Sequence, residues 1–176
     1  MSTREDANNL HSFTQAFQGL VFGVLLAYLA LINLDFGRMH VSLMFLPVAM
    51  IFLWPPKASQ AWSLFFVFIL GVFFDILTSG PIGVWGLSYL LLFVLFDGGI
   101  GQKMGTVLAL FSFVFALLLV YAMALVFGRF SMGHWPDMGG LAINAVASFF
   151  VFPVIYAIVS LFSDAHESQP QSKARP

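Results

Sequence analysis

The 176-residue chain contains no cysteine and very little charge. Without cysteine it can form no disulfide, no thiolate nucleophile and no cysteine-ligated metal centre. Charged residues make up 9% of the sequence, against about 25% in an average soluble domain. Its seven Lys and Arg residues are scattered and are balanced by eight Asp and Glu residues, so it has no basic tract suited to nucleic acid. We therefore expect partners other than nucleic acid.

Apolar residues dominate the composition instead. Hydrophobic residues account for 60% of the chain, phenylalanine alone contributes 22 positions, and the mean hydropathy is +0.95. A globular domain of this composition would expose a large apolar surface to water, so we expect this surface to face the lipid bilayer. Lipid-exposed segments must satisfy their own backbone hydrogen bonds, and long apolar runs without alternation favour helices. The sequence therefore predicts an all-α, polytopic membrane protein.

Six apolar stretches predict about six transmembrane helices: residues 16–34, 41–54, 61–78, 82–96, 104–127 and 138–162. A hydrocarbon core about 30 Å thick requires roughly 20 helical residues. The second and fourth stretches are shorter, so we expect them to include flanking residues, to thin the bilayer, or to sit inside the bundle. Pro47 removes a backbone donor from the second stretch and predicts a kinked or partly buried helix there.

The flanking charges predict the orientation of the chain. An even number of spans places both termini on one side of the membrane. If that side is the cytoplasm, only Arg38 and Arg129 among the Lys and Arg residues lie outside, as the positive-inside rule favours. The expected organisation is a disordered cytoplasmic tail over residues 1–14, a six-helix transmembrane domain over residues 15–162, and a second disordered cytoplasmic tail over residues 163–176.

Residues 67–95 differ from the otherwise generic lipid-facing sequence. Asp75 lies close to the end of the third predicted helix, and a Thr-Ser-Gly-Pro-Ile-Gly turn follows it. Gly80 and Gly83 can adopt backbone angles that are closed to other residues, and Pro81 fixes one more angle. We therefore expect a rigid hairpin of the third and fourth helices at the outer face of the membrane.

Asp75 shares one helix face with Gly71, which lies four residues earlier. Gly71 allows a neighbouring helix to approach closely, and Asp75 would point into the same contact. An acidic side chain at this depth and at a helix C-terminus needs compensation, for which Arg38, backbone amides of the turn and Asn144 are candidates. We favour a structural role in pinning the hairpin over a proton relay, because no second buried carboxylate accompanies Asp75.

The last predicted helix carries a second polar stripe. Gly140, Asn144 and Ser148 recur every four residues, so they share one helix face. Asn144 lies well inside the span, where its amide needs a hydrogen-bond partner, and ordinary helix packing would explain the stripe. Pro153 predicts a kink further along the same helix.

Residues 71–83, Gly-Val-Phe-Phe-Asp-Ile-Leu-Thr-Ser-Gly-Pro-Ile-Gly, resemble the signature of the MreD family of bacterial cell-shape proteins. Arg38 at the start of the second helix agrees with that family in order, as does Asn144 followed by Pro153, so the resemblance covers roughly residues 38–160. The second helix often begins with Arg-Pro in relatives, where this chain has Arg-Met.

The resemblance implies a function that residue spacing alone does not predict. It implies a non-enzymatic inner-membrane component of the rod-shape system, or elongasome, which regulates peptidoglycan synthesis during side-wall elongation. It implies MreC as the direct partner, with RodA, its transpeptidase and MreB in the wider complex. It also implies a fold similar to the six-helix substrate-binding subunits of ECF-type vitamin transporters. The structural or partner-binding motif would comprise Arg38, Gly71, Asp75, Gly80, Pro81, Gly83, Asn144 and Pro153, with no catalytic residue, cofactor or metal.

Other hypotheses stay open on the sequence alone. A vitamin-like binding subunit of a transporter would need a polar-lined pocket at the outer face. The polar residues near that face could line such a pocket or could equally be solvated loop ends, and they are Asp35, Arg38, His40, Asp75, Arg129, His134 and Asp137. A retained small ligand in the purified protein would favour it. A membrane enzyme would need paired carboxylates, a metal cluster or a nucleophile motif, and the chain has no nucleophile elbow and no His-Glu-x-x-His pattern. A third hypothesis is an unrelated six-helix protein whose Asp75 motif serves packing alone.

Overall fold

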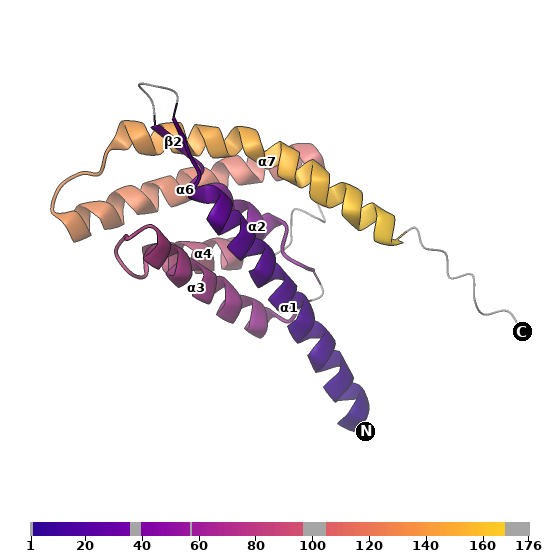
Figure 1. Ribbon diagram of the computed structural model, residues 1–176. Coiled ribbons are helices and arrows are strands. Elements are labelled where there is room, and N and C mark those ends of the chain that lie inside the picture. The colour runs from indigo at the N-terminus through magenta and orange to yellow at the C-terminus, as the bar shows by residue number, and fades with distance from the viewer. Residues whose placement is uncertain (1, 36–39, 57, 97–104, 168–176) are drawn as a thin grey trace, which may run out of the picture.

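The computed structural model describes residues 2–35, 40–56, 58–96 and 105–167, and their regular structure is almost entirely helical (Figure 1). In chain order the elements are α1 (Ser2–Ala30), β1 (Asn33–Asp35), β2 (His40–Ser42), the 3-10 helix η1 (Leu46–Val48), α2 (Ala49–Phe52), α3 (Gln60–Leu77), α4 (Val84–Leu95), α6 (Thr106–Met132) and α7 (Met138–Glu167). β1 and β2 form one short antiparallel ladder in which Leu34 pairs with Val41.

Four helices in the described ranges are long and apolar enough to cross a membrane: Asn9–Ala30, Gln60–Leu77, Thr106–Ser131 and Met138–Ser160. Their mean hydropathies lie between 1.5 and 2.7. Helices of this length and composition are those of a membrane protein, in agreement with the composition of the chain. The prediction of six transmembrane helices is not confirmed, because the second and fourth apolar stretches form shorter elements.

The second stretch is the larger departure from prediction. Residues 41–54 contain the end of β2, the three-residue η1 and the four-residue α2, so no continuous helix forms there. Pro47 lies in the first turn of η1, where its missing amide hydrogen leaves no intrahelical bond unmade. The fourth stretch forms α4, whose 12 residues extend about 18 Å. Every residue from Phe45 to Trp54 is buried, so the second stretch lies inside the bundle.

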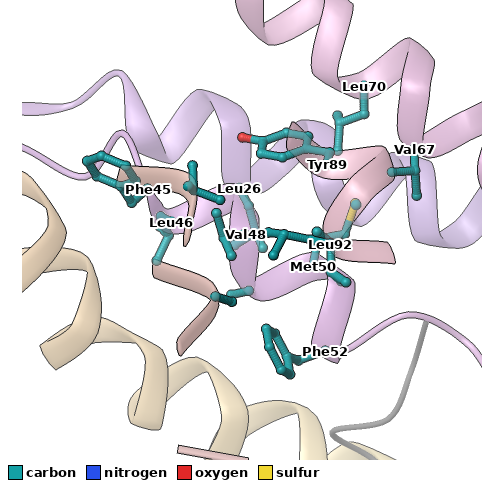
Figure 2. Close-up of a cluster of buried hydrophobic side chains, with 14 of the residues drawn as sticks. Leu26, Phe45, Leu46, Val48, Met50, Phe52, Val67, Leu70, Tyr89 and Leu92 are labelled. Carbon is teal, nitrogen blue, oxygen red and sulfur yellow. The ribbon is translucent and has the colours of Figure 1, made fainter. Parts of the chain in front are cut away.

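The buried η1–α2 segment is the centre around which the long helices pack. Figure 2 shows side chains of α1, α3 and α4 in one buried cluster with those of η1 and α2. The ring of Phe52 lies 5.1 Å from that of Phe96, 5.8 Å from that of Phe113 and 6.0 Å from that of Phe152. These aromatic contacts connect α2 to the end of α4, to α6 and to α7.

The start of α1 and the end of α7 lie at one end of the bundle (Figure 1). β1, β2, the α3–α4 turn and the α6–α7 turn lie toward the opposite end, called the loop end below. Residues 2–14 and 163–167 are helical, so the structure differs there from the predicted disordered tails. The remaining residues of both predicted tails lie outside the described ranges. α7 continues through Pro153 as one helix.

Candidate functional site

The α3–α4 turn begins with a residue in the left-handed conformation. α3 ends at Leu77, and Ser79 then adopts a φ of 52°. The amide of Ser79 donates to the carbonyl of Ile76 at 3.2 Å, and the amide of Gly80 donates to the carbonyl of Asp75 at 3.0 Å. This pair of bonds is a Schellman motif, which satisfies carbonyls at the end of a helix and reverses the chain.

The turn uses its two glycines differently from the sequence prediction. Gly83 adopts a φ of 101°, which only glycine takes readily. Gly80 does not require glycine in this way, because α3 ends early enough for Ser79 to occupy the left-handed position instead. A Cβ atom built on Gly80 would lie 3.4 Å from the hydroxyl of Thr78, which is a close but accommodated contact. The prediction of an unusual backbone angle is therefore wrong at Gly80.

Asp75 is fully buried and is held by the first turn of α4. Its Oδ2 atom accepts hydrogen bonds from the amide of Gly83 at 2.8 Å and from the amide of Gly86 at 3.4 Å. Its Oδ1 atom accepts from the amide of Trp85 at 3.0 Å. One side chain of α3 thus satisfies three backbone donors of α4.

The Asp75 side chain acts as the N-cap of a helix to which it does not belong. The N-cap residue of α4 is Gly83, which has no side chain to satisfy the free amides of the first turn. Asp75 supplies the missing oxygens from α3. Its oxygens also face the positive end of the α4 dipole, which offsets the unfavourable position of Asp75 at the C-terminal end of α3.

The sequence offers three candidates to compensate the Asp75 carboxyl group, and the structure shows that backbone amides of the turn do so. Arg38 lies outside the described residues. Asn144 bonds elsewhere, because its Oδ1 atom accepts from the amide of Ser42 at 2.8 Å and its Nδ2 atom lies 3.6 Å from the sulfur of Met44. Asn144 joins α7 to the end of β2, 102 residues away in sequence.

Gly71 is the point where α3 touches the backbone of α4. A Cβ atom built on Gly71 would lie 2.7 Å from the backbone nitrogen of Gly86 and 2.8 Å from the carbonyl carbon of Trp85. Any side chain at this position would force the two helices apart. The close approach expected at Gly71 agrees with this geometry, while its partner Gly86 is missing from the predicted motif. A second glycine inside the apolar fourth stretch is the signal that could have identified it.

The structure thus divides the predicted motif into separate parts. Gly71, Asp75 and Gly83 lie together with the turn that contains Gly80 and Pro81. Asn144 belongs to a separate contact between α7 and β2. Pro153 lies further along α7, and Arg38 is outside the described residues.

The sequence did not predict that two buried hydroxyl groups would lack a hydrogen-bond partner. The hydroxyl groups of Tyr89 on α4 and Ser148 on α7 are buried and have no hydrogen-bond partner. Ser148 belongs to the predicted polar stripe of α7, whereas Tyr89 packs among the rings of Phe74 and Trp85. Among the residues that the structure describes, no group of three or more His, Asp or Glu side chains is placed to hold a metal ion.

An apolar groove of about 420 Å³ lies between α6 and α7. Its α6 wall consists of Val114, Leu117, Leu118 and Tyr121. Its α7 wall consists of Ala142, Ala145, Val146 and Phe149. Nothing in the sequence patterns predicts this feature, because it depends on how far apart the two helices stand.

Contacts between α6 and α7 close the groove at both ends. Toward the loop end, the hydroxyl of Tyr121 donates to the carbonyl of Met138 at 3.2 Å. Toward the opposite end, the rings of Phe113 and Phe152 stack with their centroids 3.8 Å apart. The groove lies between these two contacts.

Comparison with known proteins adds no relative. No protein-family profile matches the chain, and neither a curated protein nor a solved structure matches it. Function must therefore be argued from the geometry of the α3–α4 hairpin and from the residues that build it.

Proposed function

We propose that this chain is an MreD-like, non-enzymatic component of the rod-shape system that binds MreC and regulates peptidoglycan synthesis during side-wall elongation. The observation that carries the proposal is the connected unit formed by Gly71, Asp75 and Gly83. These are the positions on which the resemblance to the MreD family depends, and they support one another physically. A motif whose parts act together is better explained by a shared structural role than by separate chance.

The bonding of Asp75 favours a binding protein over an enzyme or a proton carrier. Its carboxyl group is 0% exposed and accepts from three backbone amides of α4. A general acid or base needs contact with a substrate, whereas the oxygens of Asp75 are engaged by backbone amides. Asp75 instead fixes the angle and distance between two helices. The α3–α4 hairpin is thus suited to be a rigid scaffold.

The proposal includes the location and topology that the resemblance implies. The chain would reside in the bacterial inner membrane with both termini in the cytoplasm. Its support is that α1 begins and α7 ends at the same end of the bundle (Figure 1), and that this orientation leaves only Arg38 and Arg129 among the cations outside. In this topology the buried segment of residues 41–54 and the short α4 complete six passages of the chain.

The mechanism that fits this arrangement is retention of a partner helix. MreC would be bound through its transmembrane helix, and the amount of MreC held in the membrane would set how much is free to activate wall synthesis. RodA, its transpeptidase and MreB would belong to the wider complex. The small-residue contacts and apolar faces of the helices support binding within the bilayer.

Purification in mild detergent from the native membrane, followed by mass spectrometry of the recovered proteins, tests the proposal. We expect recovery of a single-span coiled-coil protein of the MreC type together with wall synthases. Recovery of a pair of ABC-type ATPases with a retained small ligand would instead establish the vitamin-transporter hypothesis. Recovery of neither set, from membranes in which the MreC-type protein is abundant, would overturn the proposed partner.

A further inference from the structure

We infer that the groove between α6 and α7 receives one apolar transmembrane helix of the partner protein, and that this helix carries a carboxylate near the loop end of its span. The inference rests on the proposed function for the existence of such a partner. It goes beyond that function by naming the surface and the chemistry of the occupant.

The walls of the groove have the spacing of helix-packing surfaces. Positions 114, 117, 118 and 121 on α6 follow the pattern i, i+3, i+4, i+7, and positions 142, 145, 146 and 149 on α7 follow the same pattern. Two such stripes side by side form the kind of groove into which the apolar side chains of a third helix fit. Ala142 and Ala145 make the α7 wall shallow, so the backbone of an incoming helix can approach α7 closely.

α6 and α7 are also the two spans with the least packing inside the protein. Only 22% of the most apolar window of α6 and 11% of that of α7 are buried, compared with 39% for α3. A helix pair with little internal packing has most of its surface available to a partner. The groove is part of that surface.

Arg129 supplies the charge that specifies the partner. It is exposed, and it lies eleven residues beyond Leu118, which places it within about 20° of Leu118 around α6, on the Leu118 side of the groove wall, and about 16 Å further toward the loop end. Its guanidinium carbon lies 5.9 Å from the centroid of the Trp135 ring, and no carboxylate pairs with it in the described part of the chain. A helix seated in the groove would pass Arg129, where a carboxylate would be attracted.

A second copy of this chain fits the groove less well than a different protein. All copies have the same orientation in a membrane, so a two-fold axis along the membrane normal places the same residues of both copies at the same depth. Arg129 would then face Arg129 near the interface, and like charges repel.

A phospholipid is also a poorer occupant than a helix. The groove begins eight residues inward from Arg129 and ends fifteen residues inward, at about 12 to 22 Å along α6. This is the middle of a hydrocarbon core about 30 Å thick, where acyl chains end. A headgroup held at Arg129 could therefore fill little of the groove, whereas a transmembrane helix passes Arg129 and the groove together.

Filling the groove should release the partner without unfolding this protein. In Ala145→Leu, the added side chain would occupy the space of the incoming helix, and we expect recovery of the MreC-type partner to fall at least tenfold at an unchanged membrane level. Ala142→Leu, at a more exposed position of the same wall, should do the same. Ala61→Leu is the matched control, because Ala61 is exposed at the start of α3, and it should leave recovery unchanged.

The absence of cysteine from the chain allows a direct test of contact. Leu118→Cys should form disulfides with single cysteines placed along the partner helix. Leu25→Cys, at a similarly exposed position of α1, should not. Arg129→Glu should lower partner recovery severalfold, and Arg129→Lys should retain it. These two variants separate loss of the positive charge from loss of packing.

The outcomes separate failure of the groove from failure of the proposed function. If the wild-type protein recovers the partner and Ala145→Leu recovers it equally well, with no disulfide at position 118, the groove is not the binding surface, although the proposed function stands. If native mass spectrometry finds a phospholipid that Ala145→Leu expels while the partner stays, the occupant is lipid and the inference is wrong. If the wild-type protein recovers no MreC-type partner, the proposed function and this inference fail together.

Discussion

The α3–α4 and α6–α7 hairpins share one plan, in which two antiparallel helices join at the loop end, but they are held together differently. α3 and α4 meet backbone to backbone at Gly71 and Gly86, and Asp75 bonds to three amides of α4. The contacts between α6 and α7 include a ring stack and a hydrogen bond, and a groove of about 420 Å³ lies between these two contacts.

The contrast indicates which hairpin is fixed and which is available. In lipid no hydrophobic driving force draws helices together, so association depends on close packing and on hydrogen bonds between helices. The α3–α4 hairpin has both in one place. The α6–α7 hairpin has fewer such contacts and would gain stability from a further helix.

The largest effect should come from removing the Asp75 carboxyl group. Asp75→Ala leaves the amides of Gly83, Trp85 and Gly86 buried without an acceptor, and we expect a loss of about 3–5 kcal/mol in the free energy of unfolding. Its membrane level should fall sharply, as measured by immunoblotting of membrane fractions and by thermal unfolding in detergent.

Asp75→Asn is the matched control for that variant. Its amide oxygen can still accept from one or two of the three amides, so about half of the stability should return. An Asp75→Ala variant with a normal membrane level but reduced partner recovery would contradict the structural role. It would make Asp75 a contact residue instead.

The next largest effect should come from separating the backbones of α3 and α4. Gly71→Leu places a side chain against Gly86 and Trp85, and overpacking of this kind costs about 1–3 kcal/mol or more. The control is Gly105→Leu, because a Cβ atom built on Gly105 has no neighbour within 4 Å. Equal melting temperatures for the two variants would show that Gly71 is not a close contact.

A smaller effect should follow from releasing α7 from β2. Asn144→Leu leaves the amide of Ser42 without its acceptor, and we expect a loss of about 1–2 kcal/mol in the free energy of unfolding. Ser148→Ala, one turn away on the same face, should change stability little because the Ser148 hydroxyl has no partner to lose. Comparison of the two melting temperatures in detergent tests whether the hydrogen bond between Asn144 and Ser42 holds α7 against β2.

Local features of the fold could be predicted from the sequence, and long-range ones could not. The helix spacing of Gly71 and Asp75 and the turn that follows are enough to predict a close hairpin with a compensated carboxyl group, because all partners lie within fifteen residues. The bond between Asn144 and Ser42 joins residues 102 apart, so no local pattern reveals which acceptor and donor meet. The η1–α2 segment likewise depends on the helices around it. The short length of this stretch and Pro47 indicate that no regular transmembrane helix forms there. The packing of the surrounding helices decides which local structure forms instead.

The left-handed residue that follows the first helix of each hairpin gives the finest comparison between the two hairpins. α6 ends in a left-handed glycine, Gly133, with a φ of 73°, whereas the left-handed residue after α3 is Ser79, with a φ of 52°. A side chain in this conformation costs about 1 kcal/mol relative to glycine. Replacing it with glycine removes this cost, but part of the stability gained is lost because glycine has greater conformational freedom in the unfolded chain. Ser79→Gly should therefore stabilise the protein by about 0.5–1 kcal/mol, and Gly133→Ser should destabilise it by a similar amount. Opposite shifts in melting temperature would confirm that both turns depend on a residue in the left-handed conformation. A loss of stability in Ser79→Gly would mean instead that the Ser79 side chain makes a contact worth more than the strain that it imposes.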